Sequence, residues 1–315
     1  MVTPTTTPTP RPTRTPIPRE TPDPTSTVNA VLPTPSPPPP LTPAQTPLPI
    51  PDAVLVGAGD IADCASSGDE ATAALLDQIP GIVFTLGDNV YNGGTAAEFA
   101  DCYAPSWGRH RARTLPAMGN HDYGSPAASG YFDYFGAAAG PRGAGYYSYD
   151  TGAWHVIVLN SNCEKVGGCH PGSTQEQWLR ADLAAHPRAC TAAYWHHPRF
   201  SSGDHGSDAA TQAFWQALYE AGAEIVLSGH DHSYERFAPQ GPTGEPDAAG
   251  GIREFVVGTG GRDLYGFPSV APNTEIRDAS TFGVLVLTLG DGRYGWQFIP
   301  AAGGAFVDSG SGICH

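Results

Sequence analysis

Five apolar, β-prone runs of this chain each stop at a residue that can bind a metal ion. The runs end at Asp60, at Asp88 with Tyr91, at Asn120 with His121, at His196, and at His230 with His232. A buried carboxylate or imidazole without a partner is costly, so this repeated placement needs a shared cause. In open α/β sheets the ligand crevice lies beyond the carboxyl ends of the strands. The pattern therefore predicts a centre for two metal ions at the ends of several strands.

Hydrophobic periodicity predicts two βαβ units. The first is a strand, a helix and a strand over 54–59, 70–79 and 82–87. The second follows the same order over 191–195, 209–221 and 224–227. The strands are short and β-branched, and the helices carry apolar residues at helical spacing. The sequence between the two units is expected to be rich in strands.

Further strands are expected at 146–149, 155–159, 252–257, 284–289 and 294–299. Turn signals at Thr151-Gly152 and Asp291-Gly292 separate the first two and the last two of these segments. Two βα-containing halves with added antiparallel strands favour an α/β fold in which two mixed β-sheets pack face to face with flanking helices, an αββα sandwich.

The first 50 residues have a different composition from the rest. They hold 17 of the 32 prolines and no glycine. Proline fixes φ and removes backbone donors, so we expect a disordered Pro/Thr-rich linker or stalk over 1–50, followed by one folded domain over 51–315. The composition resembles O-glycosylated stalks of exported proteins, and a tail without function is the alternative.

Charge excludes several kinds of partner. The net charge is −15 and Lys165 is the only lysine, which argues against nucleic acid or an anionic membrane as a standing partner. The Arg109, Arg111 and Arg113 group is interpreted as a solvated face.

No apolar run reaches the length of a membrane span. The chain start lacks the features of a signal peptide, so we expect a cleaved signal or a misplaced gene start. Nothing indicates the oligomeric state.

Six cysteines form an even set without a Cys-x-x-Cys pair. In an exported protein such a set indicates three disulfides, and 15 pairings are possible for six cysteines. Cys163 and Cys169 bracket a short loop and are the natural local pair. For the others we expect Cys64 with Cys102 and Cys190 with Cys314, the last of which would tie down the C-terminus. Six buried thiols in a cytosolic protein are the alternative.

The spacing of Asp88 and Tyr91 supports a shared ion site. A carboxylate at a strand end can bridge two ions, while a residue three positions on turns back to one of them. Alone, an Asp after Gly is usually a turn residue and a tyrosine usually packs. Asp60 ends the neighbouring strand, and a parallel arrangement would bring its carboxylate next to that of Asp88.

The histidine pairs give the most specific local signal. His230 and His232 are separated by one residue, so both rings project to the same side of an extended backbone. A solvent-facing turn is the alternative. Of His196 and His197 only one ring can point at a given site, and we select His196.

Four segments resemble the ordered motifs of the purple acid phosphatases, which belong to the calcineurin-like metallophosphoesterases. The segments are Gly87–Tyr91, Gly119–Asp122, His196–Phe200 and Gly229–Arg236. The resemblance extends over nearly all of residues 52–300, in the family's order, and the last segment is its most specific part. It implies the calcineurin-like phosphoesterase fold.

The resemblance also implies a ligand set, with Asp88 as the bridge between two ions. One ion would be held by Asp60, Asp88, Tyr91 and His232, and the other by Asp88, Asn120, His196 and His230. Many metallophosphoesterases have a histidine where this chain has Ala62, and Tyr91 would replace that ligand. Tyrosine ionises readily only beside a strong Lewis acid, so the resemblance implies Fe(III) at the Tyr91 site. Zn, Mn or Fe(II) would suit the mixed ligands of the other site.

The implied reaction is hydrolysis of a phosphate ester by hydroxide that the two cations generate from water. His121, paired with Asp122, is the expected proton donor to the leaving group, and His205 is a second candidate. Arg236 is expected to brace its loop, and a role in orienting the phosphate is the alternative. Asp122 and Phe200 depart from common family residues on the leaving-group side.

We therefore expect an exported or cell-surface acid-phosphatase-type enzyme that acts on phosphomonoesters. A phosphodiesterase or nucleotidase with the same two-ion site is the nearest alternative. An alternative of another class is a non-catalytic surface-binding module on a stalk, which would not need a complete ligand set.

Overall fold

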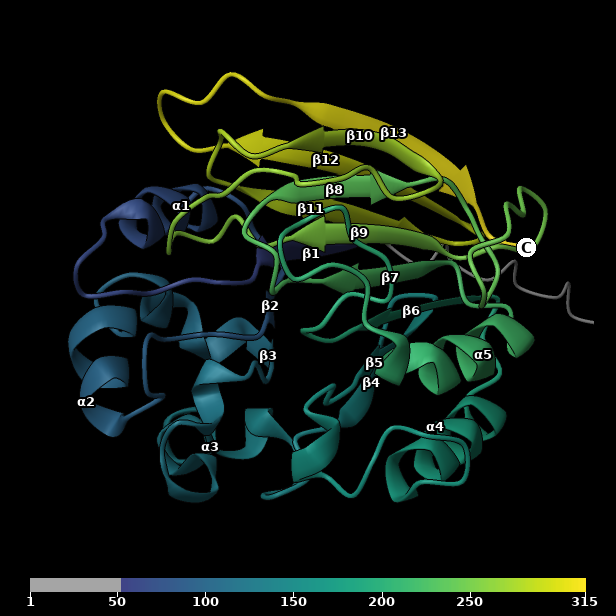
Figure 1. Cartoon of the computed structure of the whole chain (residues 1–315), viewed down its shortest axis with the longest axis horizontal. Helices are drawn as coiled ribbons and strands as arrows, with labels where there is room; N and C mark the ends of the chain where they lie inside the picture. Colours follow the sequence, from purple (N-terminus) through teal and green to yellow (C-terminus); the bar gives the residue numbers. More distant parts are fainter. Residues whose placement is uncertain (1–51) are drawn as a thin grey trace, which may run out of the picture. The chain divides into compact units, whose positions relative to one another are not determined.

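The structure is a computed structural model that describes residues 52–315, so the predicted stalk over 1–50 lies outside the described residues. Two β-sheets form the centre of the described part, with helices on their outer sides (Figure 1). The first sheet has six strands in the order β13-β12-β11-β1-β2-β3. Its strands are β1 Ala53–Ala58, β2 Ile82–Leu86, β3 Thr114–Ala117, β11 Gly283–Gly290, β12 Arg293–Pro300 and β13 Asp308–Ile313.

The second sheet has seven strands in the order β10-β8-β9-β7-β6-β5-β4. They are β4 Tyr147–Thr151, β5 Trp154–Val158, β6 Cys190–Tyr194, β7 Ile225–Ser228, β8 Tyr234–Phe237, β9 Arg253–Val257 and β10 Thr274–Asp278. Strands β5, β6, β7 and β9 are parallel, whereas β4, β8 and β10 pair antiparallel with their neighbours. In the first sheet only β1, β2 and β3 are parallel, so both sheets are mixed.

Alternating side chains hold the sheets together. On β5, Val156 and Val158 pack in the same buried cluster as Leu285 and Leu287 of β11 in the other sheet. The intervening Ile157 points to the opposite face and joins a second cluster with residues of the helix over 212–220. Because strand side chains alternate between faces, one sheet contributes to both layers. The predicted sandwich of two mixed sheets with flanking helices is confirmed.

Within residues 52–315, five α-helices and seven short helical turns connect the strands. The α-helices are α1 Gly68–Leu76, α2 Ala96–Glu98, α3 Ser129–Phe135, α4 Thr174–Ala185 and α5 Gln212–Glu220. The short turns are η1 Phe99–Tyr103, η2 Trp107–Arg113, η3 His121–Tyr123, η4 Pro126–Ala128, η5 Gly136–Ala139, η6 Cys163–Lys165 and η7 Ala209–Thr211. None of the described helices combines the length and apolar character needed to cross a membrane.

Both βαβ units are confirmed, since β1 pairs parallel with β2 and β6 pairs parallel with β7. The expectation of a strand-rich segment between them is wrong for residues 96–139, where β3 is the only strand and short helical turns dominate. These turns are too short to show a helical period in the sequence. The ends of α1 also differ from the prediction, because the helix begins at Gly68 and ends at Leu76.

The three predicted disulfides are confirmed. They join Cys64 to Cys102, Cys163 to Cys169, and Cys190 to Cys314. The last one links the start of β6 to the residue after β13, so it connects the two sheets near the C-terminus.

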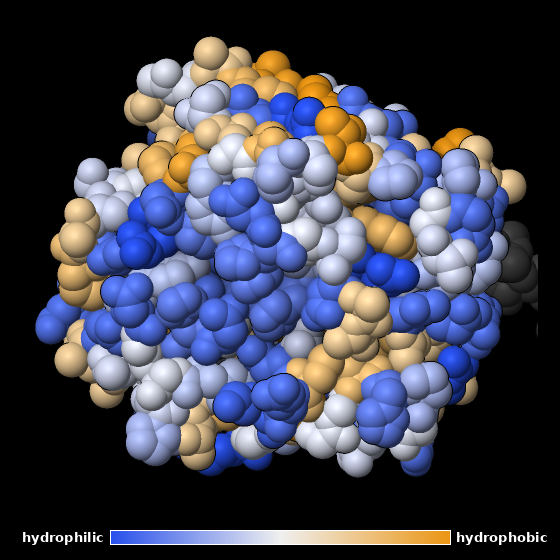
Figure 2. All heavy atoms as spheres, viewed as in Figure 1, coloured by the Kyte–Doolittle hydropathy of each residue, from blue (hydrophilic) through white to orange (hydrophobic). Residues whose placement is uncertain are grey.

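The middle of the face shown in Figure 2 is mostly hydrophilic, and larger hydrophobic patches lie toward its upper edge.

Candidate metal centre

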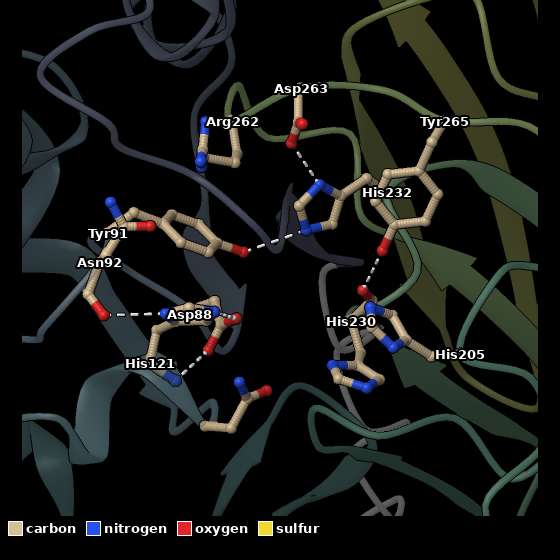
Figure 3. A pocket seen from close by; sticks show the side chains of 11 residues that line it. Asp88, Tyr91, Asn92, His121, His205, His230, His232, Arg262, Asp263 and Tyr265 are labelled. Carbon is tan, nitrogen blue, oxygen red and sulfur yellow. Dashed lines mark hydrogen bonds and ion pairs between the residues drawn. The ribbon is translucent and has the colours of Figure 1, made fainter.

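All seven predicted metal ligands come together at one edge of the two sheets. Asp60, Asp88 and Asn120 follow the parallel strands β1, β2 and β3, while His196 and His230 follow β6 and β7. The carboxyl ends of these strands therefore meet at a common place. An open cavity of about 200 Å³ lies there. Figure 3 shows the side chains that line it. The cavity is lined by Asp88, Tyr91, Asn92, Asn120, His121, His205, His230, His232, Arg262, Asp263 and Tyr265.

One group of donor atoms surrounds the Tyr91 hydroxyl. The Tyr91 Oη lies 2.9 Å from Asp60 Oδ1 and 3.1 Å from His232 Nε2. The Asp60 Oδ1 and His232 Nε2 atoms are 3.5 Å apart. These contacts join two oxygens and one nitrogen in a small triangle, which suits a strongly Lewis-acidic ion with mixed ligands.

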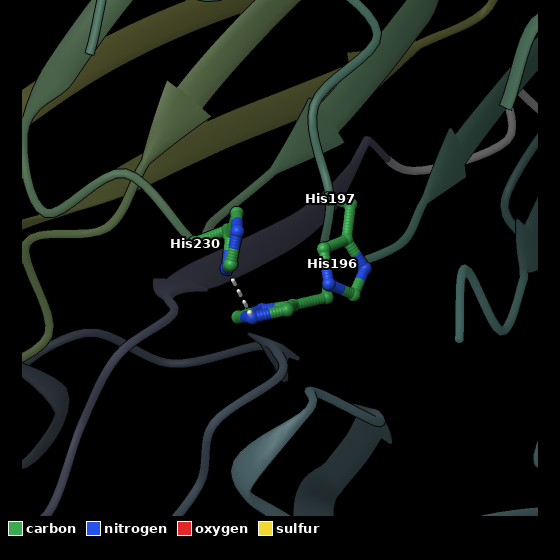
Figure 4. A group of neighbouring side chains, drawn as sticks. All are labelled: His196, His197 and His230. Atoms are coloured by element: carbon green, nitrogen blue, oxygen red, sulfur yellow. Dashed lines mark hydrogen bonds between the residues drawn. The ribbon is translucent and has the colours of Figure 1, made fainter. Parts of the chain in front are cut away.

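The second group surrounds the ring of His196. Figure 4 shows this ring beside those of His197 and His230. The His196 Nε2 lies 2.9 Å from Asn120 Oδ1, 3.1 Å from His230 Nδ1 and 3.4 Å from Asp88 Oδ2. Ligand atoms of Asp60, Asp88 and His196 also lie within 4.8 Å of one another, so Asp88 stands between the two groups. The donor set thus fits two ions that share Asp88. That these residues bind metal stays a prediction.

The backbone is strained at three of these positions. Asp60, Asp88 and His230 have φ angles of 61°, 48° and 70°, in the left-handed region that non-glycine residues rarely adopt. Such strain persists only where the surrounding structure fixes it, and it clusters at functional sites. Gly119 shows the tight fit, because a Cβ atom there would lie 2.0 Å from Asp88 Oδ1. At these strand ends the unfavourable backbone conformation directs the side chains into the centre.

Two histidines are oriented by a hydrogen bond on the ring nitrogen that faces away from the centre. His196 Nδ1 lies 2.7 Å from the carbonyl oxygen of Leu86, and His232 Nδ1 lies 2.6 Å from Asp263 Oδ1. Each contact leaves Nε2 directed at the other donors. Partners of this kind fix the tautomer and the ring direction of metal-binding histidines. Sequence reasoning missed Asp263, although the glycine-rich end of β9 is a further strand end on the same edge.

We expect Asp263→Asn to weaken metal binding at the His232 position by about tenfold to a hundredfold, because the orienting carboxylate is lost. Chelator competition with the purified variant measures this effect. Asp101→Asn is the matched control, since Asp101 is exposed. Unchanged affinity in Asp263→Asn would contradict the orienting role.

The electrostatics of the centre favour a bound cation. Burial and the charges of Asp60 and Asp88 raise the pKa of Tyr91 well above its usual value. Burial raises the pKa of Asp88, but the charge and hydrogen bond of His196 outweigh it and hold that pKa well below its usual range. Burial lowers the pKa of His196, but the charge and hydrogen bond of Asp88 outweigh this effect and raise that pKa to about 9. Without an ion, a proton on His196 therefore balances the buried carboxylates, and metal ions compete with protons for such ligands.

His197 and His230 behave as neutral rings. Burial and the charge of His196 lower the pKa of His197 to about 3. Burial and the charges of His196 and His197 likewise lower the pKa of His230. His197 Nδ1 lies 2.8 Å from Ser161 Oγ, so this residue is a hydrogen-bonded neighbour of the centre.

The predicted pairing of His121 with Asp122 is wrong. Asp122 is fully buried behind the centre, where it accepts hydrogen bonds from the backbone of Gly119 and from Asn89. Adjacent residues in the η3 turn point apart, so Asp122 braces the loop that carries Asn120. Burial and the charge of Asp88 raise its pKa to about 7.

His121 and His205 both line the cavity. His121 Nδ1 lies 2.9 Å from the carbonyl oxygen of Asn92, and its Nε2 lies 4.0 Å from Asp88 Oδ2. The His205 ring stacks on the His230 ring with centroids 4.1 Å apart. Arg236 does not line the cavity. It lies in β8 and donates a hydrogen bond to Asp308 at the start of β13, so it links two strands of different sheets, and its predicted role in bracing a loop stays a prediction.

The fold and the strand-end site define a metallophosphoesterase. Residues 48–234 match the family described as Calcineurin-like phosphoesterase, and the chain belongs to this family. Its curated relatives include purple acid phosphatases. Purple acid phosphatase 15 of Arabidopsis thaliana is 26% identical over 231 residues, which cover 62% of this chain and 42% of the relative. Purple acid phosphatase 23 of the same plant is 27% identical, and the match covers 49% of that relative's length. This chain thus spans less than half the length of these plant relatives.

Solved structures support the fold. Purple acid phosphatase PPD1 from yellow lupin seeds matches 84% of this chain with a TM-score of 0.68 and 19% identity, and 55% of the lupin chain is covered. GAP50, described as the anchor in the inner membrane complex of Plasmodium, matches 84% of this chain with a TM-score of 0.67 and 14% identity, over 89% of its own length. At this identity the likeness concerns the fold alone.

Proposed function

We propose that this chain is a dinuclear phosphatase that hydrolyses phosphomonoesters, of the acid-phosphatase type. The observation that carries the proposal is the pair of donor groups that share Asp88 in an open cavity. A binding module has no need for this complete ligand set, nor for the strained backbone of Asp60, Asp88 and His230. The purple acid phosphatase relatives support the same reaction.

We assign Fe(III) to the Tyr91 position and Zn, Mn or Fe(II) to the position of Asn120, His196 and His230. The environment raises the pKa of Tyr91, so only a strongly Lewis-acidic ion would take it as phenolate. When bound, two such ions supply charge neutralisation for a phosphate and lower the pKa of a coordinated water toward neutrality. The protein residues provide the orientation, because buried contacts fix His196, His232 and Asp88.

The chain also supplies candidates for proton transfer to the leaving group. The His121 Nδ1 contact with Asn92 holds the ring so that Nε2 faces the cavity. His121 is about one third exposed, with 35% of its side chain accessible, so a substrate oxygen can approach it. We assign His121 as the proton donor and keep His205, on the opposite side of the cavity, as the second candidate.

His121→Ala is expected to keep both ions and to lower kcat on the order of a hundredfold, as general acid–base groups typically contribute. Elemental analysis and steady-state kinetics on the same preparation check this. His170→Ala, at an exposed histidine outside the cavity, is the control. Loss of metal in His121→Ala would contradict the assigned role.

The ester preference tests the proposed reaction. We expect kcat/KM for p-nitrophenyl phosphate to exceed that for bis(p-nitrophenyl) phosphate by at least about tenfold, a ratio that pocket contacts can supply. The reverse preference would overturn the proposal in favour of the phosphodiesterase or nucleotidase alternative.

We also propose that the chain is exported and that residues 1–50 form a stalk. Three disulfides support export, because such bonds persist in oxidising compartments and are rare in the cytosol. A small phosphate ester is the proposed partner.

A further inference from the structure

A second cavity adjoins the metal centre on the side of Asn120 and His197. Its volume is about 380 Å³, compared with about 200 Å³ for the first. Asn120 lines both cavities, and the rings of His197 and His230 have centroids 4.4 Å apart. A group attached to a phosphate at the metal centre therefore has room to extend into the second space. We call this space, lined by Ser161–Lys165, His197 and Asp208, the side cavity.

The wall of the side cavity is held in place before any ligand binds. Asn160, at the start of this loop, exchanges two hydrogen bonds with the Gln175 side chain of 2.7 and 2.9 Å. The Cys163–Cys169 disulfide closes the loop that follows. A wall fixed in this way loses little conformational entropy on binding, which is a requirement for a selective site.

The side cavity offers both donors and acceptors. Ser161 Oγ accepts a hydrogen bond from the His197 backbone N–H at 3.0 Å and contacts His197 Nδ1 at 2.8 Å. The Ser161 hydroxyl can thus donate to Nδ1, which leaves an N–H at His197 Nε2. Within residues 52–315, the side chains of Glu164 and Lys165 form no hydrogen bond or ion pair. Hydroxyl groups both donate and accept, so a hydroxylated ligand can form hydrogen bonds with His197, Glu164 and Lys165 alike.

The charges around the side cavity disfavour a second anionic group. Glu164 and Asp208 line it together with Lys165, the only lysine in the chain. Two carboxylates thus face one ammonium group, and the chain as a whole carries a net charge of −15. A leaving group with its own carboxylate or phosphate would meet net repulsion here.

We propose that the side cavity binds the leaving group of the substrate and selects uncharged, hydroxylated alcohols such as a polyol or a sugar. This inference rests on the proposed phosphomonoesterase function. Hydrolysis breaks the P–O bond to this alcohol, and water supplies the new oxygen on phosphorus. The released hydroxyl takes its proton from His121, which regains one from the same water. Free alcohol and inorganic phosphate are the products.

Glycerol phosphate and phosphoglycerate form a matched pair of substrates that differ by one carboxylate in the leaving group. We expect the wild-type enzyme to favour glycerol phosphate in kcat/KM by about fivefold, since close charges in partly exposed sites contribute on the order of 1 kcal/mol. Equal kcat/KM values, or a preference for phosphoglycerate, would overturn the selectivity.

Glu164→Lys tests the cavity itself. The variant is expected to raise kcat/KM for phosphoglycerate by about tenfold relative to glycerol phosphate, because the repulsion becomes attraction. Asp291→Lys is the matched control, with the same change in net charge. Asp291 is exposed in the turn after β11, at the end of the sheet where β1 begins and away from Asp60. This control is expected to leave the substrate ratio unchanged.

The outcomes separate the two proposals. If the metal-loaded wild-type enzyme hydrolyses neither substrate nor p-nitrophenyl phosphate, the proposed function fails. If it hydrolyses them but Glu164→Lys and Asp291→Lys give the same substrate ratio, the side cavity is not the leaving-group site and this inference alone is overturned.

Discussion

Asp88→Ala is expected to remove both metal ions and to lower kcat/KM by more than about a thousandfold, because the shared ligand of a two-ion site supports both positions at once. Its Oδ2 lies 3.4 Å from His196 Nε2, and its Oδ1 accepts a hydrogen bond of 2.8 Å from the His121 backbone N–H. Loss of one carboxylate therefore opens both donor groups. Elemental analysis together with turnover of p-nitrophenyl phosphate measures the effect.

Two further variants make this result specific. Asp88→Asn keeps the shape of the side chain and one oxygen for the His121 N–H, yet it lacks the charge that two cations share, so it is expected to lose metal as well. Asp101→Ala, at an exposed site, should keep both ions and full turnover. A folded Asp88→Asn protein that keeps two ions and normal turnover would contradict the bridging role.

Replacing Cys190 and Cys314 together with serine is expected to lower the free energy of unfolding by about 5 kcal/mol, since this disulfide closes a long loop in the unfolded chain. The two cysteines are 124 residues apart in sequence, whereas Cys163 and Cys169 are 6 apart. The equivalent change at the short loop should cost only about 2 kcal/mol. Urea denaturation of both variants compares these losses, and a larger loss at the short loop would contradict the entropic account.

The sequence was sufficient to predict the fold where periodicity is strong. The β1–β2 and β6–β7 units were predicted because buried parallel strands are continuous apolar runs and α5 has apolar residues at helical spacing. The segment over 96–139 could not be predicted in this way. Its helical turns are short and are held by tertiary contacts, such as the hydrogen bond from Tyr131 to the Pro116 carbonyl oxygen.

The convergence of the candidate ligands was predictable for a different reason. Each of Asp60, Asp88, His196 and His230 comes two residues after the end of a strand, and parallel strands bring such positions to one edge. Asp263 could not be placed, because it lies in a loop whose path over the centre depends on how the two sheets pack. The wrong pairing of Asp122 has a related cause. Whether two adjacent side chains point to the same side depends on the local backbone conformation, which the sequence did not reveal here. The η3 turn directs Asp122 inward.

The metal content and visible spectrum of the isolated protein test whether Asp88 and Tyr91 belong to a two-ion centre. We expect two metal ions per chain, one of them ferric, with a visible absorption band from the Tyr91 phenolate that disappears in Tyr91→Phe. An active preparation that contains iron and is colourless would contradict the ferric assignment at Tyr91. An active preparation with a single ion per chain would contradict the shared two-ion centre itself.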